Sequence, residues 1–362
     1  MTLTELGWNE FFAAAFARHA AAKVEPARVV CELRRNFYAV RTADDEVLAE
    51  CGGGFFHHAR TPEKFPAVGD WVAIRRRAGE ARADIQAVLP RRTKLSRRAA
   101  GSEQIEQIIA ANIDTALLVS GLDLNFSPRR IQRFLVAAKE SGAEAAIILN
   151  KSDVCADADA VGREVETLAP GVRVHLTSVR TRHGIRALAA AYARPGRTLA
   201  FVGSSGVGKS SLINALDRDA DLPIGDVREK DSKGRHTTTR RELVITRSGA
   251  LIIDTPGMRE FQLWDSDAGL EDAFADVVAI AARCRFSDCN HTNEPDCAVR
   301  VALASGELTS HRYDGYQKLK SELNLRRAGE RKKPSALASK PGWKKKAEGQ
   351  KSFRWSDRDV RE

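Results

Sequence analysis

Short apolar runs recur along this chain, and their spacing predicts two kinds of β-sheet. Between about residues 27 and 95 the runs are separated by turn-rich stretches such as Cys51–Gly54, which is typical of a small all-β unit. A five-stranded barrel of the oligonucleotide-binding type fits this pattern. Phe55 and Phe56 are expected to pack in its core, with base stacking as the alternative. The alanine-rich residues 1–25 are expected to be helical. The strands are expected at 28–33, 36–40 and 70–74.

Further along the chain the apolar runs are more continuous, as in strands buried on both faces of a parallel sheet. Ser127 and Pro128 are expected to open a helix that ends near Gly142. The core-facing side of that helix is Ile131, Phe134, Leu135 and Ala138. These elements predict a doubly wound α/β domain. Its strand-forming runs are 145–149, 174–176, 199–202 and 250–253.

The residues after the run at 199–202 fit the complete phosphate-loop pattern G-x-x-x-x-G-K-[ST]. Glycines in such a loop let backbone N–H groups point at a phosphate, and the following helix directs the positive end of its dipole there. We expect Lys209 on the β- and γ-phosphates and the Ser210 hydroxyl on Mg²⁺. The expected GTP-binding residues here are Gly203, Ser204, Ser205, Gly206, Val207, Gly208, Lys209, Ser210 and Ser211.

A guanine-recognition tetrad, Asn150-Lys151-Ser152-Asp153, follows the run at 145–149. The Asp153 carboxylate is expected to accept from the N1 and N2 protons of guanine, a pair of donors that adenine lacks. Asn150 is expected to hold the loop, and Lys151 to lay its methylene stem along the ring. After the run at 174–176, the segment Thr177-Ser178-Val179 is expected to give a backbone N–H to the guanine oxygen, with Ser178 as the expected GTP-binding residue.

A third nucleotide motif, Asp254-Thr255-Pro256-Gly257, follows the run at 250–253. We expect Asp254 to order the Mg²⁺ shell and the Gly257 N–H to meet the γ-phosphate. The next position is commonly glutamine in Ras-like proteins, where it orients the attacking water. Here it is Met258, whose thioether cannot do so.

The tetrad precedes the phosphate loop, whereas an ordinary GTPase presents the phosphate loop first. This inversion predicts a circularly permuted nucleotide domain, which is physically allowed because domain termini lie at the surface and often close together. The segment after Gly257 then leads directly into the C-terminal region, so nucleotide state is expected to act on that region.

Three cysteines and one histidine gather within fourteen residues of the C-terminal region: Cys284, Cys289, His291 and Cys297. This set matches a closed Cys₃His site for one structural zinc ion, because no ligand position is left for water. Disulfides are the alternative, but the chain has only six cysteines and shows neither a secretory signal nor a transmembrane stretch. Cys31, Cys51 and Cys155 are expected to be ordinary buried thiols.

Much of the net charge of +10 is concentrated near the C-terminus. Residues 326–362 hold thirteen Lys or Arg against five Asp or Glu, and a second basic stretch spans 91–98. Such a tail is expected to be disordered when free and to be attracted to a polyanion, with solubility alone as the alternative. A membrane partner is not expected, because no apolar face accompanies the charge.

The permuted motif order, the upstream barrel and the Cys-x₄-Cys-x-His-x₅-Cys site together resemble the RsgA (YjeQ, EngC) family of ribosome small subunit-dependent GTPases. The resemblance covers nearly the whole chain and implies a GTP hydrolase that acts late in maturation of the small (30S) ribosomal subunit. It also implies contact with rRNA through the barrel and the zinc domain, and stimulation of hydrolysis by the subunit. The basic tail and the alanine-rich N-terminus are less typical of the family.

The same resemblance points to a residue that takes the place of the missing glutamine. The segment Gly234–Thr239 lies between the phosphate loop and Asp254, where a mobile switch is expected. By resemblance to the family motif, His236 positions water or the γ-phosphate. Thr238, with Thr237 as the alternative, completes the Mg²⁺ shell.

These inferences predict a cytoplasmic monomer that binds GTP and GDP and does not bind a membrane. One alternative is a non-catalytic, GTP-regulated RNA-binding assembly module. Another is a different P-loop enzyme, such as an ATPase or kinase, against which Asp153 argues. The expected domains are an N-terminal extension (1–26), an OB-fold barrel (27–98), the permuted GTPase domain (102–265), an α-helical zinc-binding domain (266–328) and a basic disordered tail (329–362).

Overall fold

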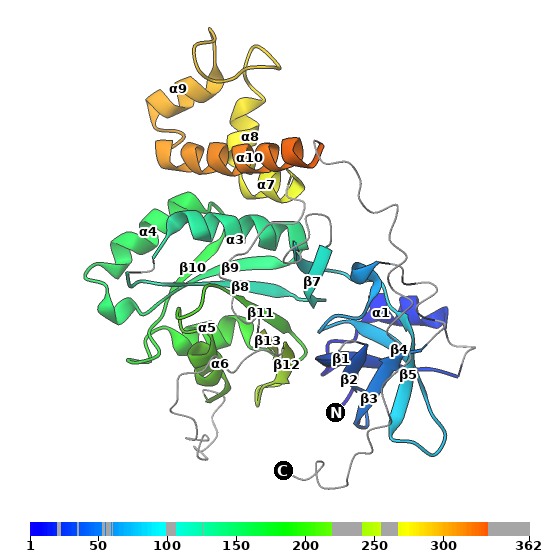
Figure 1. Ribbon diagram of the computed structural model, residues 1–362. Coiled ribbons are helices and arrows are strands. Elements are labelled where there is room, and N and C mark those ends of the chain that lie inside the picture. The colour runs from blue at the N-terminus through cyan, green and yellow to red at the C-terminus, as the bar shows by residue number, and fades with distance from the viewer. Residues whose placement is uncertain are drawn as a thin grey trace. The chain divides into compact units, whose positions relative to one another are not determined.

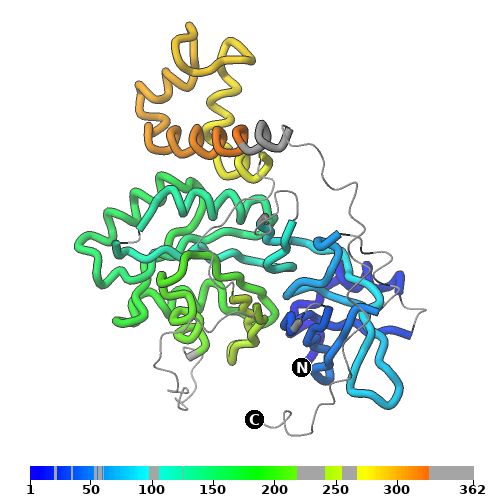
Figure 2. Tube along the Cα trace, in the orientation of Figure 1, coloured from blue at the N-terminus to red at the C-terminus, as the bar shows by residue number. Residues whose placement is uncertain are grey.

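The computed structural model describes most of the chain, of which Met1–Lys320 forms one compact unit (Figures 1 and 2). The predictions for His236, Thr238 and Gly257 concern residues outside the described ranges, as do those for Phe56 and for the basic tail beyond Arg331. The start of the predicted tail, up to Arg331, is not irregular but continues the last helix, Ser310–Arg331. The described ranges are 1–19, 23–34, 36–52, 55, 59, 61–98, 106–124, 126–218, 241–254 and 267–331.

The N-terminal strands close into a five-stranded barrel, as predicted. The parallel pair β3–β5 and four antiparallel pairs, including β1–β4, complete the ring. The third strand expected here starts at Trp71 rather than Asp70, because the Asp70 N–H is used in a turn, where it donates to the Ala67 carbonyl at 3.0 Å. Phe55 packs against Phe65 beside the barrel core, with ring centroids 5.7 Å apart. The strands are β1 (Glu25–Arg34), β2 (Phe37–Arg41), β3 (Glu46–Cys51), β4 (Trp71–Arg76) and β5 (Arg82–Val88).

The helix expected over residues 1–25 is much shorter than predicted. In the described part of residues 1–25, that is 1–19 and 23–25, the one helix is α1 (Glu10–Ala17), and the side chain of Asn9 caps its start. The chain enters β1 at Glu25, since that stretch pairs with β4. Alanine content favours a helix locally, but strand pairing and packing override it.

A parallel sheet with one antiparallel edge strand forms the centre of the fold. Its strand order is β10-β9-β8-β11-β13-β12, and β12 also pairs with barrel strand β1. A separate hairpin of β6 (Lys94–Arg98) and β7 (Glu106–Ala111) precedes it in the chain. The sheet strands are β8 (Thr115–Gly121), β9 (Glu144–Asn150), β10 (Arg173–Leu176), β11 (Thr198–Val202), β12 (Glu242–Ile245) and β13 (Leu251–Asp254).

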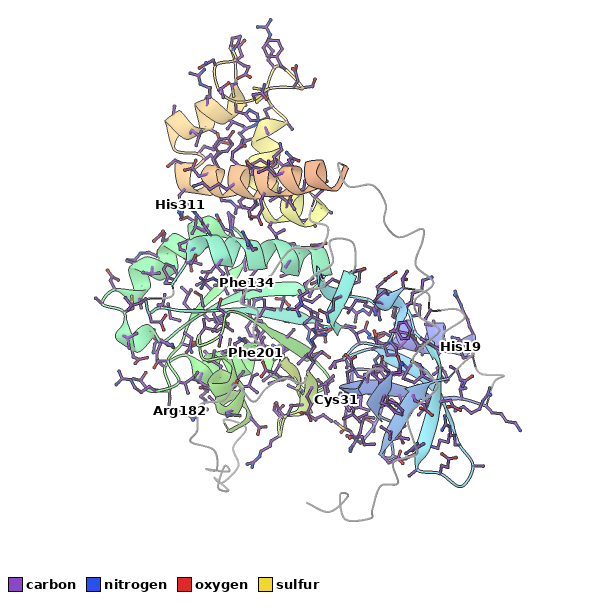
Figure 3. All side chains as sticks on the ribbon, in the orientation of Figure 1. His19, Cys31, Phe134, Arg182, Phe201 and His311 are labelled. Atoms are coloured by element: carbon purple, nitrogen blue, oxygen red, sulfur yellow. The ribbon has the colours of Figure 1, made fainter. Side chains whose placement is uncertain are left out.

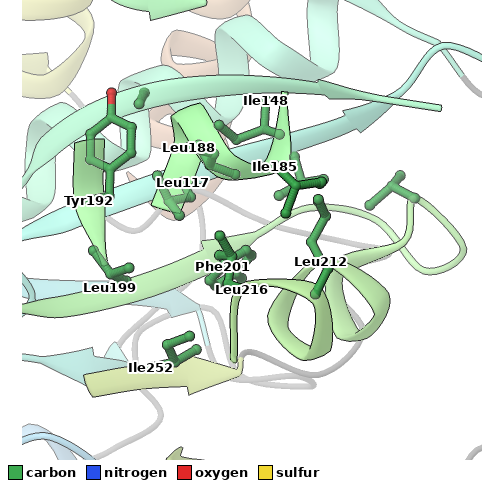
Figure 4. Close-up of a cluster of buried hydrophobic side chains, with 14 residues drawn as sticks. Leu117, Ile148, Ile185, Leu188, Tyr192, Leu199, Phe201, Leu212, Leu216 and Ile252 are labelled. Carbon is green, nitrogen blue, oxygen red and sulfur yellow. The ribbon is translucent and has the colours of Figure 1, made fainter. Parts of the chain in front are cut away.

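Helices cover both faces of this sheet, which makes it doubly wound (Figure 1). Helices α3 (Pro128–Ser141) and α4 (Ala158–Leu168) lie on one face, and Phe134 of α3 is buried there (Figures 1 and 3). On the other face, α5 (Ile185–Tyr192) and α6 (Lys209–Arg218) pack against Phe201 and its neighbours (Figure 4). Each fully buried Leu or Phe contributes about 1.5–3 kcal/mol.

The predicted boundaries of α3 are correct, although the cap differs in detail. Ser127 stands at the N-cap position but its hydroxyl makes no capping hydrogen bond. Pro128 supplies the preset φ of the first turn, and Gly142 ends the helix at a φ of +78°. The four side chains expected to face the core are all buried.

The C-terminal region within the first unit is helical, as predicted. Buried Arg312 of α10 joins it to the sheet domain, because the guanidinium donates to the Leu168 carbonyl at the end of α4 and to Asp276. Gly269 is also needed, since a Cβ there would lie 2.7 Å from the Val136 carbonyl of α3. The helices are α7 (Asp267–Ala273), α8 (Ala275–Ala281), α9 (Ala298–Ser305) and α10 (Ser310–Arg331).

Candidate nucleotide site and metal centre

All three nucleotide motifs follow the carboxyl ends of parallel strands. The phosphate loop follows β11, the tetrad begins with Asn150 at the end of β9, and Asp254 is the last residue of β13. Carboxyl ends of parallel strands meet at one edge of a sheet, and ligands of open α/β sheets bind in the crevice outside that edge. The topology therefore brings the motifs together at the expected place.

The phosphate loop leads into α6, which begins at Lys209. Lys209 is 8% exposed, and its ammonium donates to the carbonyls of Gly203 at 2.8 Å and Ser204 at 3.0 Å. Burial lowers the pKa of Lys209, and the nearby Asp254 carboxylate opposes that shift. A desolvated ammonium at a helix N-terminus is well suited to an anionic phosphate.

The tetrad and the phosphate loop are joined by direct hydrogen bonds. Asn150, 2% exposed, donates from Nδ2 to the Val207 carbonyl at 2.9 Å. Lys151, in the left-handed region at φ +61°, donates from Nζ to the Gly206 carbonyl at 2.7 Å. The two segments are therefore neighbours in space although the tetrad comes first in sequence.

Gly208 shows how closely these two segments approach each other. Its φ is +94°, and a Cβ at this position would lie 2.4 Å from Nδ2 of Asn150. No L-residue with a side chain fits such a contact without displacing the asparagine. The second glycine of the motif is thus required by the tetrad as well as by the backbone conformation.

The Asp153 carboxylate is held at both oxygens. The Ser178 hydroxyl donates to one oxygen, and Nε of Arg180 donates to the other at 2.6 Å. Both hydrogen bonds, that of Ser178 first, lower the pKa of Asp153 and keep it ionised. An ionised acceptor in a fixed orientation is what recognition of two adjacent N–H donors requires.

The expected backbone donor beside Ser178 needs a correction. The Ser178 N–H already donates to the His183 carbonyl at 3.0 Å, and the Thr177 N–H donates to Leu149 at 2.9 Å. Ser178 therefore contributes its hydroxyl to Asp153. Of the predicted segment, Val179 is the residue whose N–H makes no hydrogen bond within the described ranges.

Asp254 has the environment expected of a cation ligand. Its Oδ1 is buried and finds no hydrogen-bond partner in the part of the chain that the structure describes. Burial raises the pKa of Asp254, while the Lys209 charge lowers it. An orphaned carboxylate oxygen beside a phosphate loop fits Mg²⁺, a hard cation that prefers oxygen ligands.

The second predicted constellation also forms. The ligand atoms of Cys284, Cys289, His291 and Cys297 all lie within 4.8 Å of one another. Nδ1 of His291 is 3.5 Å from the sulfurs of Cys284 and Cys297, which are 4.0 Å apart. A tetrahedral zinc with Zn–S bonds of about 2.3 Å separates sulfurs by about 3.8 Å. The four residues therefore fit zinc.

The loop that carries these ligands is ordered by one carboxylate. Glu294 accepts hydrogen bonds from the backbone N–H groups of Asn290, Thr292 and Asn293. The hydrogen bond from its own backbone N–H, followed by these three, lowers the pKa of Glu294 to about 2. His291 lies in the left-handed region at φ +60°. The loop thus turns tightly enough to bring His291 back to the cysteines.

Comparison with known proteins agrees with this geometry. The family model described as RsgA GTPase matches residues 88–264. A small ribosomal subunit biogenesis GTPase RsgA of Opitutus terrae is 45% identical over 362 residues, covering 97% of this chain and 98% of the relative. The chain belongs to the RsgA GTPase family. A relative named RsgA 2, from Lactiplantibacillus plantarum, is 44% identical over 290 residues, covering 80% of this chain and 81% of its own.

Two solved structures extend the comparison to the fold. YjeQ from Thermotoga maritima is 28% identical with a TM-score of 0.60, covering 83% of this chain and 98% of that one. YloQ, whose structure is titled a circularly permuted GTPase, is 27% identical with a TM-score of 0.58, covering 84% and 96%. This member of the RsgA family is therefore a circularly permuted GTPase that hydrolyses GTP, and the ATPase, kinase and non-catalytic alternatives are set aside.

Two polar residues of this RsgA-family site escaped the sequence analysis. Asp123 accepts a 2.6 Å hydrogen bond from Lys151, and Arg180 is the partner of Asp153 described above. Asp123 lies two residues after the end of β8. Because binding sites of α/β sheets lie at the carboxyl ends of strands, the sequence could have indicated Asp123 as a site residue. No sequence pattern indicated Arg180, because its contact with Asp153 depends on the conformation of the turn after β10.

Among the helices in the described ranges, none is both long enough and apolar enough to cross a bilayer.

Proposed function

We propose that this GTPase acts in the maturation of the small (30S) ribosomal subunit in the cytoplasm, as a monomer that binds the subunit's rRNA and is stimulated by it. The observation that carries the proposal is the 45% identity, over nearly the full length of both chains, to a relative named for small ribosomal subunit biogenesis. The basic tail supplies charge for a polyanion, whereas in the basic stretch at 91–98 the side chains of Arg91 and Lys94 are ion-paired with Asp70 and Glu106.

In the proposed nucleotide complex the guanine base is bound by two loops, the tetrad at the end of β9 and the turn after β10. Asp153 accepts from the N1 and N2 protons, with Ser178 and Arg180 holding its carboxylate. The stem of Lys151 lies along the ring, and Val179 offers its N–H to the guanine oxygen. Asn150 and Ser152 keep the tetrad in place, Asn150 through its bond to Val207.

The phosphates are proposed to lie over the loop of residues 203–210. Lys209 neutralises charge on the β- and γ-phosphates, and the first turn of α6, with Ser211, directs N–H groups at them. Ser210, Thr238 and Asp254 are the residues that hold Mg²⁺, which supplies charge neutralisation at the transferred phosphoryl group. Gly257 offers its N–H to the γ-phosphate.

Hydrolysis also needs a group that orients the attacking water. Met258 cannot act as a hydrogen-bond partner of that kind, so we assign the role to His236. Replacing His236 with alanine is expected to lower the rate of GTP turnover about a hundredfold, while leaving GTP affinity nearly unchanged, because positioned acid–base groups contribute about 10²–10⁴-fold.

The measurement for His236 is single-turnover hydrolysis together with nucleotide titration. His311→Ala is the matched control, since His311 is exposed in the C-terminal region and is expected to change neither quantity. Unchanged turnover in His236→Ala would reject the assignment and move the search to the neighbouring threonines.

The Cys₃His cluster leads to a prediction about stability. The purified protein is expected to contain a single zinc ion, and Cys289→Ser is expected to lose it and to destabilise the helices around it. Structural zinc contributes about 10–16 kcal/mol of apparent binding free energy in small domains, which becomes folding free energy there. Metal analysis and amide hydrogen exchange of α8 and α9 measure the two effects.

Cys155→Ser serves as the control for that experiment, because Cys155 is a free cysteine outside the cluster. Cys155 is half-buried and not buried as expected, whereas Cys31 and Cys51 are buried. It is expected to keep both the zinc and the exchange protection of the helices. A wild-type protein without zinc, or a Cys289→Ser variant with unchanged protection, contradicts the structural role.

The experiment that tests the function as a whole compares nucleotides and partners. GTP and ATP hydrolysis are measured with and without purified small ribosomal subunits. Turnover of GTP alone, faster with subunits, is the expected result. Equal turnover with and without subunits removes the maturation role, while comparable ATP turnover removes the proposed part of Asp153.

A further inference from the structure

One buried arginine joins four separate segments of the chain. Arg28 of β1 is 1% exposed, and its guanidinium donates to the carbonyls of Leu6, Gly69 and Asn112, the last two at 3.3 and 3.2 Å. It also donates to Oγ1 of Thr198 at 2.9 Å. Burial lowers the pKa of Arg28 to about 10, so it remains charged at neutral pH.

The acceptors of Arg28 are neutral and come from different parts of the fold. Leu6 lies in the N-terminal segment, Gly69 in the barrel and Asn112 just before β8, while Thr198 begins β11. A buried charge is costly unless it is well hydrogen-bonded, and losing one acceptor leaves that cost uncompensated. The arginine therefore fixes the barrel to the strand that leads into the phosphate loop.

The N-terminal segment closes over this arginine by close backbone packing. A Cβ on Gly7, whose φ is +85°, would lie 2.6 Å from Nη1 of Arg28 and 3.0 Å from the Gly196 carbonyl. A Cβ on Gly196 would lie 2.8 Å from the Thr4 carbonyl. Residues 4–7 are thus seated against the turn that precedes β11.

The same segment is attached to the barrel through aromatic side chains. Trp8 packs against Trp71 of β4 at 4.6 Å between ring centroids, and Phe12 of α1 lies 5.9 Å from the same ring. Leu6 and Leu89 complete this buried cluster. We call residues 1–17 the N-terminal strap, because they contact both the barrel and the start of β11.

Barrel strand β1 also contacts the other side of the nucleotide site. Cys31 of β1, labelled in Figure 3, pairs with Glu242, the first residue of β12. The preceding Arg241 donates to the Ile108 carbonyl of β7 at 3.3 Å. Thr238 and His236 precede Glu242 by only four and six residues in the sequence. One barrel strand therefore touches both the strand before the phosphate loop and the strand after the expected switch.

We propose that the N-terminal strap and Arg28 couple the barrel to the nucleotide site, so that RNA bound by the barrel changes the rate of GTP turnover. This inference rests on the proposed stimulation by the small subunit. Arg28 is a positioning residue, because it acts through Thr198 and the strap and touches no nucleotide. A rigid attachment preorganises both parts for one partner, and loosening it removes coupling without removing the nucleotide site.

The test uses two substitutions, each with a matched control. Gly7→Ala places a methyl group against Arg28, whereas Gly79→Ala has a similar φ of +76° with nothing within 4 Å of its Cβ. Thr198→Val removes one acceptor of Arg28. Thr115→Val, on the neighbouring strand, removes a buried hydroxyl that has no partner in the part of the chain that the structure describes.

GTP turnover of all variants is measured with and without small ribosomal subunits, together with thermal unfolding. We expect Gly7→Ala and Thr198→Val to lose about tenfold in subunit stimulation, within the usual range of coupling between sites. Turnover without subunits is expected to stay within about twofold of wild type. Both controls are expected to keep the full stimulation.

The outcomes separate the coupling from the function on which it rests. If wild type and controls are stimulated and both test variants respond equally well, the strap does not couple the two parts. Coupling is rejected as well if turnover with and without subunits falls in parallel, since that shows a loss of folded protein only. If subunits do not stimulate GTP turnover of the wild type itself, the proposed function is wrong, and with it the coupling that rests on it.

Discussion

Replacing Asp153 with asparagine is expected to reverse the nucleotide preference of this enzyme. In the proposed complex the carboxylate offers two acceptors to the N1 and N2 protons of guanine, whereas asparagine presents one acceptor and one donor. Its amide donor then faces the guanine amino group, and a donor without an acceptor is costly in a closed site. Xanthine carries a carbonyl at that position, so xanthosine triphosphate restores the pairing.

The expected magnitude is a loss of about a hundredfold or more in kcat/KM for GTP, with a gain for xanthosine triphosphate. Sites built around such hydrogen bonds reject mismatched ligands by about 10⁴–10⁵. The lost ion pair with Arg180 contributes little, because the arginine side chain is 73% exposed. Steady-state kinetics with both nucleotides measure the change.

Asp157→Asn is the control for this reversal. Asp157 lies four residues away and caps α4 by accepting from the Ala160 N–H at 2.9 Å, a role that asparagine fills equally well. Its kinetics are expected to match those of wild type. An Asp153→Asn variant that still prefers GTP as strongly as wild type would falsify the placement of the base beside Asp153.

The sequence was most informative where chemistry and periodicity are local. Continuous apolar runs predicted β9, β11 and β13, because a strand that is buried on both faces needs apolar side chains at successive positions. The phosphate-loop and tetrad patterns lie directly after such strands, so the rule on carboxyl ends placed them side by side. The Cys₃His spacing was sufficient to predict that the four residues come together, since all four lie within one short stretch of the chain.

Features that depend on distant packing were missed. The strap lies within residues 1–25, for which a helix was expected. No sequence pattern in residues 1–17 predicts that Leu6 contacts Arg28 or that Trp8 contacts Trp71. Ser178 was expected to use its N–H, but the turn that ends at His183 takes that group. Pairing of β12 with β1 likewise joins residues about two hundred positions apart.

Arg28 and Arg312 are both buried and make the same kind of contact, which no local sequence pattern reveals. Arg28 and Arg312 are 1% and 3% exposed, and each donates to backbone carbonyls of segments far away in sequence. Arg312 connects the C-terminal helices to the end of α4, whose other end follows the tetrad. A planar fork of five donors is suited to such junctions, whereas a lysine in the same place satisfies fewer acceptors.

Replacing Asp254 with asparagine is expected to lower GTP turnover about a thousandfold while leaving the protein equally stable or more stable. Metal-assisted charge stabilisation contributes several kcal/mol to such reactions, and each 1.36 kcal/mol is about tenfold in rate. The raised pKa means that the folded protein binds the Asp254 proton more tightly than the unfolded chain does. Ionised Asp254 therefore weakens the fold at neutral pH, a cost that asparagine removes.

This combination of lost activity and retained stability distinguishes a Mg²⁺ ligand from a structural carboxylate. Turnover is measured over a Mg²⁺ titration and unfolding is followed by a thermal melt at pH 7. Asp217→Asn is the control, because Asp217 of α6 accepts from the Arg247 N–H at 2.9 Å and asparagine keeps that acceptor. Wild-type turnover and Mg²⁺ dependence in Asp254→Asn contradict the assignment, whereas a large drop in melting temperature shows that the carboxylate is structural.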